Sequence, residues 1–501
     1  MNVRNVVVVL LDSLNRLMVG AYGGTEFDTP NLDRVAARSV RFDRHYAGSL
    51  PCMPARHDLL TGSLDFLWRP WGSIEVWEDP VTFDLRRQGV VTMLVSDHPH
   101  LFETGGENYH TDFSAWDYVR GHEDDPWRTA PDPSAVGAPT LPPQFHRHYE
   151  ISRTWFRREE DFPGPRVMNA AARWLRELAP ADDRFLLVVD EFDPHEPFDT
   201  PEPWSGRYDP AWTGPRMIWP PYLRDAVASG MISRRELDHL RANYGSKLSM
   251  IDHWLGAVLD AFDERGLWDD TVLVVCTDHG HYLGEHDVVG KPGVPVYETM
   301  GHLPLFVAWP GVEAGERDAL TTTVDLHATL CDVFGVTPEH RTHGRSLVPF
   351  VTGAATEARD WAVMGVWGRE VSVTDGHRTY ARAPAGENAP LSMWSNRWST
   401  MPVHAFPHLR LPRPDQRAVL DRMPGSTVPV IRQPFAAGDD VPFWARTARF
   451  DGNRLFDLDV DPGESEDRCG EPLELELTEL LHTALTELEA PDDQLARLGL
   501  A

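Results

Sequence analysis

The run Asn5-Val6-Val7-Val8-Val9-Leu10-Leu11, which ends at Asp12, sets the fold class of this chain. A continuous apolar run without polar alternation is typical of a strand that is covered on both faces. Four similar runs follow along the chain, at residues 90–95, 185–189, 271–276 and 305–308. Because strands covered on both faces belong mostly to parallel sheets, these runs predict a large and mainly parallel sheet.

Helical segments lie between these predicted strands. Within residues 246–265 the apolar side chains recur at helical spacing, and Gly266 follows as a C-cap. The residues on this apolar face are Leu248, Ile251, Leu255, Val258, Leu259 and Phe262. Strands that alternate with amphipathic helices predict an α/β fold, a doubly wound sheet flanked by helices.

Polar residues that suit metal binding or acid-base chemistry follow four of these strands. They are Asp12, the pair Asp97-His98, Asp190 with His195 after it, and the pair Asp278-His279. In open α/β sheets, ligands bind outside the carboxyl ends of the strands. A capping acid or a solvated turn explains any one of these residues, but four such strand ends together predict a shared site.

Composition and charge exclude several classes of partner. The 501 residues include 77 acidic and 47 basic side chains, a formal net charge of −30, which repels nucleic acid and anionic membranes. No apolar run approaches the roughly 20 residues of a membrane span. The first residues lack a basic leader and a small-residue cleavage site. We therefore expect a cytoplasmic protein without nucleic-acid or membrane partners.

The character of the chain changes after about residue 358. Short strand-like runs at residues 361–366, 370–374, 378–382 and 454–457, with a leucine-rich amphipathic segment at 472–488, predict a smaller antiparallel sheet with one helix. We therefore divide the chain into a catalytic α/β domain, residues 1–358, and a smaller domain, residues 359–501. The Pro-rich stretch 384–445 is too long for an ordinary loop. We expect it to wrap either the catalytic domain or an oligomer partner.

Cysteine and lysine are both scarce. The scattered cysteines Cys52, Cys276, Cys331 and Cys469 form neither a disulfide framework nor a zinc-ribbon spacing. Of the 47 basic residues, only Lys247 and Lys291 are lysines. A lysine that persists among 45 arginines is expected to be needed for its compact ammonium, which a planar guanidinium does not replace.

The strongest local motif is Cys52-Met53-Pro54-Ala55-Arg56, followed by His57-Asp58-Leu59-Leu60-Thr61-Gly62. Pro54 suits the first turn of a helix, which places residue 52 at the helix N-terminus. Free N–H groups and a partial positive charge make that end an anion site. Arg56, one turn further on, is positioned to hold an anion. The competing interpretation of Cys52 is a buried structural thiol.

Cys-x-Pro-x-Arg followed by Leu-Leu-Thr-Gly resembles the signature of the sulfatases, whose cysteine is oxidised to formylglycine. This chain departs from the usual pattern at Pro51 and Met53. The resemblance implies a formylglycine formed from Cys52 by a formylglycine-generating enzyme. Its hydrated aldehyde offers two geminal hydroxyls, one for attack and one for release of the covalent adduct.

The same resemblance implies one divalent metal ion, held by Asp12, residue 52, Asp278 and His279. Ser13 and His279 stand where many sulfatases have Asp and Asn, and resemble the phosphonate monoester hydrolase branch. Oxygen-only ligand sets favour Ca2+, and an imidazole favours Mn2+ or Zn2+. We expect Ca2+ or Mn2+, with Zn2+ as a third candidate.

Further site residues follow from the resemblance. His195, between Pro194 and Pro197, and Lys291 match residues that face the ester and its leaving oxygen. Tyr109 and Thr111 share the spacing of the Lys-x-His of arylsulfatases and resemble the corresponding pair of phosphonate monoester hydrolases. We therefore expect Cys52, Arg56, Tyr109, Thr111, His195 and Lys291 to act in catalysis.

Three functions remain open at this point. The first is hydrolysis of sulfate monoesters. The second is hydrolysis of phosphonate monoesters or phosphodiesters by the same machinery, which Ser13, Tyr109, Thr111 and His279 favour. The third is a non-catalytic binding protein on the same scaffold. In the first two cases the substrate is a small anionic ester, and by analogy with relatives, often dimers or tetramers, a homo-oligomer is expected.

Overall fold

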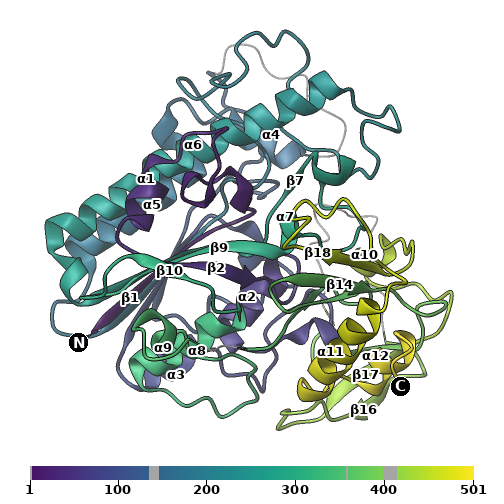
Figure 1. Cartoon of the computed structure of the whole chain (residues 1–501). Helices are drawn as coiled ribbons and strands as arrows, with labels where there is room; N and C mark the ends of the chain where they lie inside the picture. Colours follow the sequence, from purple (N-terminus) through teal and green to yellow (C-terminus); the bar gives the residue numbers. More distant parts are fainter. Residues whose placement is uncertain (1–2, 135–145, 357–358, 399–413) are drawn as a thin grey trace.

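A computed structural model describes residues 3–134, 146–356, 359–398 and 414–501. Within these residues one nine-stranded sheet dominates, in the order β10-β2-β9-β6-β1-β5-β3-β4, with β11 paired to β2. Its parallel centre consists of β6 (Thr271–Cys276), β1 (Asn5–Leu11), β5 (Phe185–Glu191) and β3 (Val91–Ser96). The structure thus confirms the predicted α/β fold with a mainly parallel sheet (Figure 1).

The other strands extend this sheet on both sides. On one side β4 (Ala115–Tyr118) pairs parallel to β3. On the other side β9 (His302–Ala308) runs antiparallel to β6 and β2 (Val40–Tyr46). Two short strands, β10 (Gly315–Arg317) and β11 (Thr321–Thr322), pair with β2. The run at 305–308 is therefore a strand as predicted, although it runs against its neighbours.

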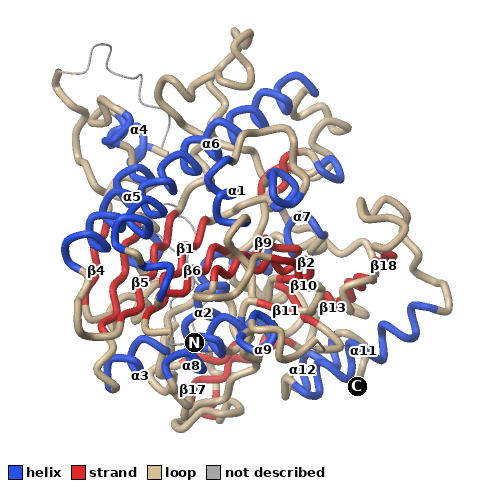
Figure 2. Tube along the Cα trace, turned by 60° about the vertical axis from the view of Figure 1, so that its left-hand side comes forward, coloured by secondary structure: helices blue, strands red, loops and turns tan. Residues whose placement is uncertain are grey.

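Helices cover both faces of the sheet (Figures 1 and 2). Val7, Val9 and Leu11 of β1 pack into one core, and Val6, Val8 and Leu10 pack into another. The first core is closed by α1 (Pro30–Ala36), α5 (Pro163–Arg173) and α6 (Arg234–Arg265). The second is closed by α2 (Cys52–Thr61), α3 (Val81–Arg87), α8 (Val324–Phe334) and α9 (Val348–Val351). This two-sided burial explains why β1 is apolar without alternation.

Helix α6 is longer than its apolar pattern predicted. It begins at Arg234 rather than near residue 246, because Ser233 caps it and exchanges hydrogen bonds with Glu236 in a capping box. It ends as predicted at Gly266, whose φ of 63° is the left-handed C-cap conformation. No helix within the described ranges is both long enough and apolar enough to cross a bilayer.

The C-terminal part forms the predicted antiparallel sheet and helix. The sheet has the order β12 (Ala362–Gly365), β13 (Val371–Thr374), β14 (Arg378–Arg382), β18 (Arg454–Asp457). Leu477, Leu481 and Leu485 of α11 (Leu473–Glu487) pack in one core with this sheet. The short α12 (Asp492–Arg497) follows near the C-terminus. The division of the chain at residues 358 and 359 stays a prediction.

The stretch 384–445, predicted to wrap a neighbour, has a sheet of its own where it is described. Residues 399–413 lie outside the described residues. On either side of them, β15 (Leu391–Ser395), β17 (Val430–Phe435) and β16 (Val419–Asp421) pair antiparallel. The Trp394 amide bonds the carbonyl of Trp68, so this sheet contacts the catalytic domain. The short α10 (Phe443–Arg446) follows it.

Smaller elements complete the described structure. A two-stranded ribbon, β7 (Tyr282–Leu283) with β8 (Val289–Gly290), follows the end of β6. The remaining α-helices are α4 (Arg147–Arg153) and α7 (Glu298–Gly301). The ribbon leads directly into Lys291, so it carries this residue from the end of β6 back toward the start of α2.

Candidate active site

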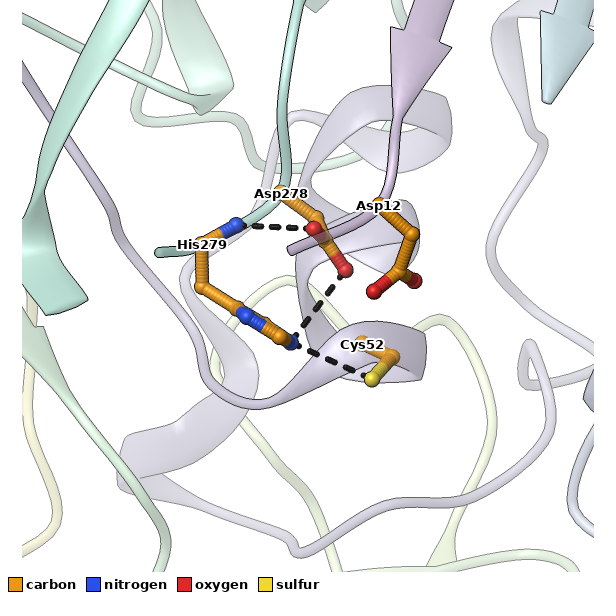
Figure 3. A group of neighbouring side chains, drawn as sticks. All are labelled: Asp12, Cys52, Asp278 and His279. Atoms are coloured by element: carbon orange, nitrogen blue, oxygen red, sulfur yellow. Dashed lines mark hydrogen bonds and ion pairs between the residues drawn. The ribbon is translucent and has the colours of Figure 1, made fainter. Parts of the chain in front are cut away.

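Four predicted metal ligands meet where β1, β6 and α2 converge. Asp12 follows β1, Asp278 and His279 follow β6, and Cys52 is the first residue of α2. One ligand atom from each lies within 4.8 Å of the other three, and all four residues are buried. Figure 3 shows the side chains pointing toward one another across a small gap. The structure thus brings the sequence-predicted set together.

His279 presents an unprotonated nitrogen to this cluster. Its Nδ1 lies 2.8 Å from the carbonyl of Gly280, which accepts its proton. Its Nε2 lies 3.1 Å from Cys52 Sγ and 3.3 Å from Asp278 Oδ2. Burial lowers the pKa of His279 to about 4, so the imidazole is neutral near pH 7. A neutral imidazole fixed through Nδ1 is the usual form of a metal ligand.

The two carboxylates of the cluster are electrostatically crowded. Burial and the adjacent Asp278 raise the pKa of Asp12 well above its ordinary value. Burial also acts to raise the pKa of Asp278, but His279 and Arg56 outweigh it and hold it low. Asp12 Oδ2 is buried, and the guanidinium of Arg56 lies 3.0 Å from it. A divalent cation suits this excess of buried negative charge, and the mixed oxygen and nitrogen donors fit such an ion.

Arg56 is fully occupied by carboxylates. Its guanidinium lies 2.7 Å from Asp278, 3.0 Å from Asp12 and 2.6 Å from Asp190, and Nη1 also donates to the carbonyl of Cys52. These contacts correct the expectation that Arg56 holds the substrate anion. Arg56 instead fixes the carboxylates behind residue 52, and Asp190 enters the site as its partner.

A second pair of groups faces Cys52 from the opposite direction. Lys291 Nζ lies 2.6 Å from His195 Nε2 and 3.9 Å from Cys52 Sγ. Burial lowers the pKa of His195 well below its ordinary value. Burial also acts to lower the pKa of Lys291, but Cys52 and Glu196 outweigh it and raise it. A charged ammonium therefore donates to a neutral imidazole beside the sulfur atom.

Tyr109 and Thr111 lie away from this chemistry. The buried Tyr109 hydroxyl donates to the carbonyls of Met53 and Gly72, at 3.3 and 3.1 Å, and burial raises its pKa. A phenol whose single proton is shared between two carbonyls keeps that proton, so it supports α2 rather than acting as a base. Thr111 is exposed and does not line the cavity beside Cys52. These contacts do not favour a catalytic role for the pair, and that role stays a prediction.

Two histidines after β3 take the place expected for that pair. The buried His98 has its Nε2 3.7 Å from Asp12 Oδ2, and neither ring nitrogen has a hydrogen bond. His100 lines the cavity that contains Cys52. Burial alone lowers the pKa of His100, but Glu103 and Glu123 raise it to about 10. The sequence feature that could have identified these two histidines is the segment Asp97-His98-Pro99-His100, which directly follows a buried strand.

Lys247, the other lysine, lies in a buried cluster behind His195. Its Nζ is 2.7 Å from Asp193 Oδ1, and His122 Nε2 is also 2.7 Å from that oxygen. Asp97 points to the same region and accepts the amide of Phe192. These groups anchor residues 192–193, immediately before His195, and are separate from the metal cluster.

A cavity of about 280 Å³ opens above Cys52. Its wall includes His195, Lys291 and residues of the C-terminal region. Phe443 and Trp444, the start of α10, close one side, and they also line an adjoining hollow of about 620 Å³. No local pattern in the sequence indicated that Phe443 and Trp444 line this cavity.

Comparisons with known proteins agree with this geometry. A family model described as Sulfatase matches residues 4–336. The chain is 25% identical over 378 residues to the choline-sulfatase of Rhizobium meliloti, covering 70% of this chain and 72% of that protein. It is 24% identical over 396 residues to the arylsulfatase of Clostridium perfringens, covering 71% and 80%.

A solved structure shares the fold over nearly the whole chain. The crystal structure of the phosphonate monoester hydrolase of Agrobacterium radiobacter superimposes with a TM-score of 0.64 at 20% identity. The match covers 97% of this chain and 95% of the other. The family model alone spans more than half of the sequence, and the matched range includes all four residues of the strand-end cluster. This chain belongs to the sulfatase family.

Proposed function

We propose that this protein hydrolyses a sulfate monoester with water to an alcohol and inorganic sulfate, through a formylglycine at position 52. One observation carries the proposal. Cys52 begins α2 inside the cluster of Asp12, Asp278 and His279, and Lys291 faces it from the cavity side. A nucleophile at a helix N-terminus, between a cation site and a fixed ammonium, suits a tetrahedral anion.

The metal ion is part of this proposal. Asp12, Asp278, His279 and the modified residue 52 would hold one divalent ion, and the candidates are Ca2+, Mn2+ and, third, Zn2+. When bound, such an ion supplies Lewis-acid activation of the nucleophile and of a sulfate oxygen. The unprotonated Nε2 of His279, held among Cys52 Sγ and Asp278 Oδ2, and the two buried carboxylates of Asp12 and Asp278 support this assignment.

Formylglycine formation is expected before folding is complete. Cys52 is only 3% exposed, so the folded chain does not offer it to a second protein. The formylglycine-generating enzyme therefore acts on the unfolded or partly folded chain, where it catalyses the oxidation of the thiol to an aldehyde by an external oxidant. Pro54 and Arg56 then have two uses, in the modification signal and in the finished site.

We assign to Lys291 and His195 the role of stabilising the negative charge on the leaving oxygen of the ester. The ammonium has three donors, and His195 accepts one of them. Another points toward residue 52, 3.9 Å from Cys52 Sγ, and the ammonium is thereby placed to meet charge that develops as the ester bond breaks. His195 is held by its Nδ1, 2.8 Å from the carbonyl of Glu196. General-acid help of this kind contributes typically about 10²–10⁴-fold.

The second candidate is hydrolysis of phosphonate monoesters or phosphodiesters. His279 in the cluster, Ser13 after Asp12, and the fold likeness to a phosphonate monoester hydrolase favour it. The loss of the Tyr109 and Thr111 pair removes two arguments for it. A non-catalytic scaffold is the least favoured function, because the metal, nucleophile and ammonium groups are all present and directed at one cavity.

Parallel kinetics decide between these functions. The metal-loaded protein, produced with a formylglycine-generating enzyme, is assayed with 4-nitrophenyl sulfate, 4-nitrophenyl phenylphosphonate and bis(4-nitrophenyl) phosphate. The shared leaving group makes the three kcat/KM values comparable. The proposal predicts the highest value for the sulfate. A dominant phosphonate or diester value selects the second candidate, and no turnover of any ester contradicts both.

A further inference from the structure

The cavity above Cys52 has an aromatic wall on several sides. Because the sulfate group must lie beside residue 52, Lys291 and His195, the alcohol half of the ester occupies the rest of this cavity. The rings that line it come from three separate segments of the chain: Trp71, Trp219 with Tyr222, and Phe443 with Trp444. Such a wall binds flat or compact apolar surfaces, and electron-rich ring faces also attract cations.

Carboxylates lie directly behind or between these rings. Glu196 accepts a 2.5 Å hydrogen bond from the Tyr222 hydroxyl. Asp124 lies 3.1 Å from His146 Nδ1, and that imidazole stacks on Trp219 with the ring centres 3.6 Å apart. Each of these two carboxylates is thus held beside an aromatic ring of the cavity.

A third carboxylate is arranged in the same way. Glu123 lies 3.2 Å from His100 Nε2, and His100 packs edge-on against Trp71. Glu103 contacts the other nitrogen of His100, so the single positive charge of His100 is shared between two carboxylates. Every carboxylate that lines the cavity therefore stands next to a ring.

The charge of the cavity is unbalanced toward negative. Glu123, Asp124 and Glu196 line it, together with the cations Lys291 and His100. Lys291 is directed at Cys52 and His195, and His100 is shared with Glu103. Asp124 Oδ1 is buried and has no hydrogen-bond partner. The part of the cavity that receives the alcohol half is therefore an anionic aromatic box.

We propose that the alcohol half of the substrate carries a positively charged nitrogen, so that the substrate is a compact zwitterionic ammonio-alkyl sulfate. This inference rests on the sulfatase function proposed above. A cation gains from the ring faces and from the three carboxylates together. A sulfated or carboxylated sugar chain would bring further negative charge against Glu123 and Asp124, which the same field disfavours.

A neutral aryl group should bind less tightly in the box than a cationic group. It would cover the rings but exclude water from the carboxylates, among them the Asp124 Oδ1 that has no hydrogen bond, without adding a compensating charge, and such desolvation is costly. The cavity volume of about 280 Å³ is large enough for a compact head group.

A pair of alcohols that differ in one atom tests this inference. 2-(Trimethylammonio)ethanol and 3,3-dimethylbutan-1-ol have the same shape, but a quaternary nitrogen replaces a quaternary carbon. Their binding to the metal-loaded protein is measured by calorimetry, which requires no turnover. We expect the cation to bind at least about fivefold more tightly, as one cation–π contact of about 1 kcal/mol gives. Equal binding, or tighter binding of the neutral alcohol, overturns the inference.

Variants distinguish the effect of the cavity residues on cation binding from the effect of the overall negative charge of the protein. Asp124→Asn and Trp219→Leu should both reduce the preference for the cation, measured as the dissociation constant of the neutral alcohol divided by that of the cationic alcohol. Asp117→Asn removes the same charge from an exposed position on β4, outside the cavity, and should leave the ratio unchanged. A ratio that is the same in all three variants as in the parent protein contradicts the box.

Kinetics keep the two proposals distinguishable. The sulfate esters of the same two alcohols are compared with 4-nitrophenyl sulfate as the reference. Hydrolysis of the aryl sulfate without any preference for the cationic ester rejects the box and retains the sulfatase function. Selective binding of the cationic alcohol without hydrolysis of any sulfate retains the box and rejects the sulfatase function.

Discussion

Lys291 Nζ lies 2.6 Å from His195 Nε2, although the two residues are 96 positions apart in the chain. The imidazole accepts and the ammonium donates, so the charge stays on the lysine, and burial keeps His195 neutral. Lys291 is one of only two lysines, and the other lies in the cluster behind His195. Each lysine contacts a group for which a compact cation is required.

Lys291→Arg should lower kcat for the preferred ester well beyond tenfold. A planar guanidinium does not fit the space between His195 Nε2 and Cys52 Sγ, and it donates in a fixed plane. Steady-state kinetics with metal content and formylglycine content matched to the parent protein provide the measurement. Turnover within about threefold of the parent would remove Lys291 from the reaction.

The peptide that contains Cys52 should carry an aldehyde after co-expression with a formylglycine-generating enzyme. Mass spectrometry detects the mass deficit of thiol-to-aldehyde conversion. Cys52→Ala should abolish hydrolysis, because the nucleophile is absent. Cys469→Ser is the matched control, since this half-buried cysteine lies far from the site, and it should keep full activity. An unmodified Cys52 in an active protein would point to a thiol mechanism.

Asp278→Asn should weaken divalent-metal binding by about tenfold or more, because it removes one charged ligand of the cluster. Metal content after dialysis, measured by plasma mass spectrometry, reports this directly and also identifies the ion. Asp97→Asn removes a carboxylate from another strand end, one that accepts the Phe192 amide and lies outside the cluster. It should retain the ion, and equal losses in both variants would argue against the assigned ligands.

Tyr109→Phe should reduce the free energy of unfolding by about 1 kcal/mol and change kcat/KM by less than about threefold. The lost hydroxyl bonds two backbone carbonyls, and a hydrogen bond of this kind contributes about 0.5–1.5 kcal/mol. Thr111→Ala, at an exposed position, should change neither quantity. Thermal melts and kinetics are the measurements, and a hundredfold loss of activity would restore a catalytic role for Tyr109.

His45→Asn should make the protein less sensitive to acid. Burial lowers the pKa of His45 to about 3, from an ordinary value of about 6.5. Below pH 6.5 only the unfolded chain takes up this proton. His45 therefore costs up to about 1.4 kcal/mol of stability for each pH unit between 6.5 and 3.

Denaturant unfolding between pH 4 and pH 7 tests this expectation. The slope of stability against pH should be shallower for His45→Asn than for the parent protein. Thr321→Val removes the partner of His45 Nδ1, 3.0 Å away, without removing a titratable group. It should keep the parent slope. Identical slopes in all three proteins would mean that His45 is not buried neutral.

Local sequence patterns predicted the elements whose burial is uniform along the chain. The boundaries of β1 and β6 match their sequence runs, because a strand covered on both faces must be apolar throughout. The metal cluster was predictable for a related reason. Parallel strands end at one edge of the sheet, so Asp12 and Asp278 had to lie near each other.

Other features depend on contacts between distant segments. The long N-terminal part of α6 is fixed by the cap at Ser233, which is invisible in its apolar stripe. The saturation of Arg56 by Asp12, Asp190 and Asp278 required the relative positions of three strands. The choice between Tyr109 and His100 for the cavity wall depended on how the turns after β3 pack.

The sequence by itself predicted the fold class, the position of Cys52 at the start of a helix and the four residues that meet in the cluster, because each follows from a short pattern with a local physical meaning. Only the tertiary structure decided which groups surround the alcohol half of a substrate. Trp71, Glu123, Trp219 and Trp444 come from four segments with no common pattern, and they meet in one cavity only when these distant segments pack together. The residues proposed to select the alcohol half are therefore brought together by contacts between distant segments, which no local sequence pattern reveals.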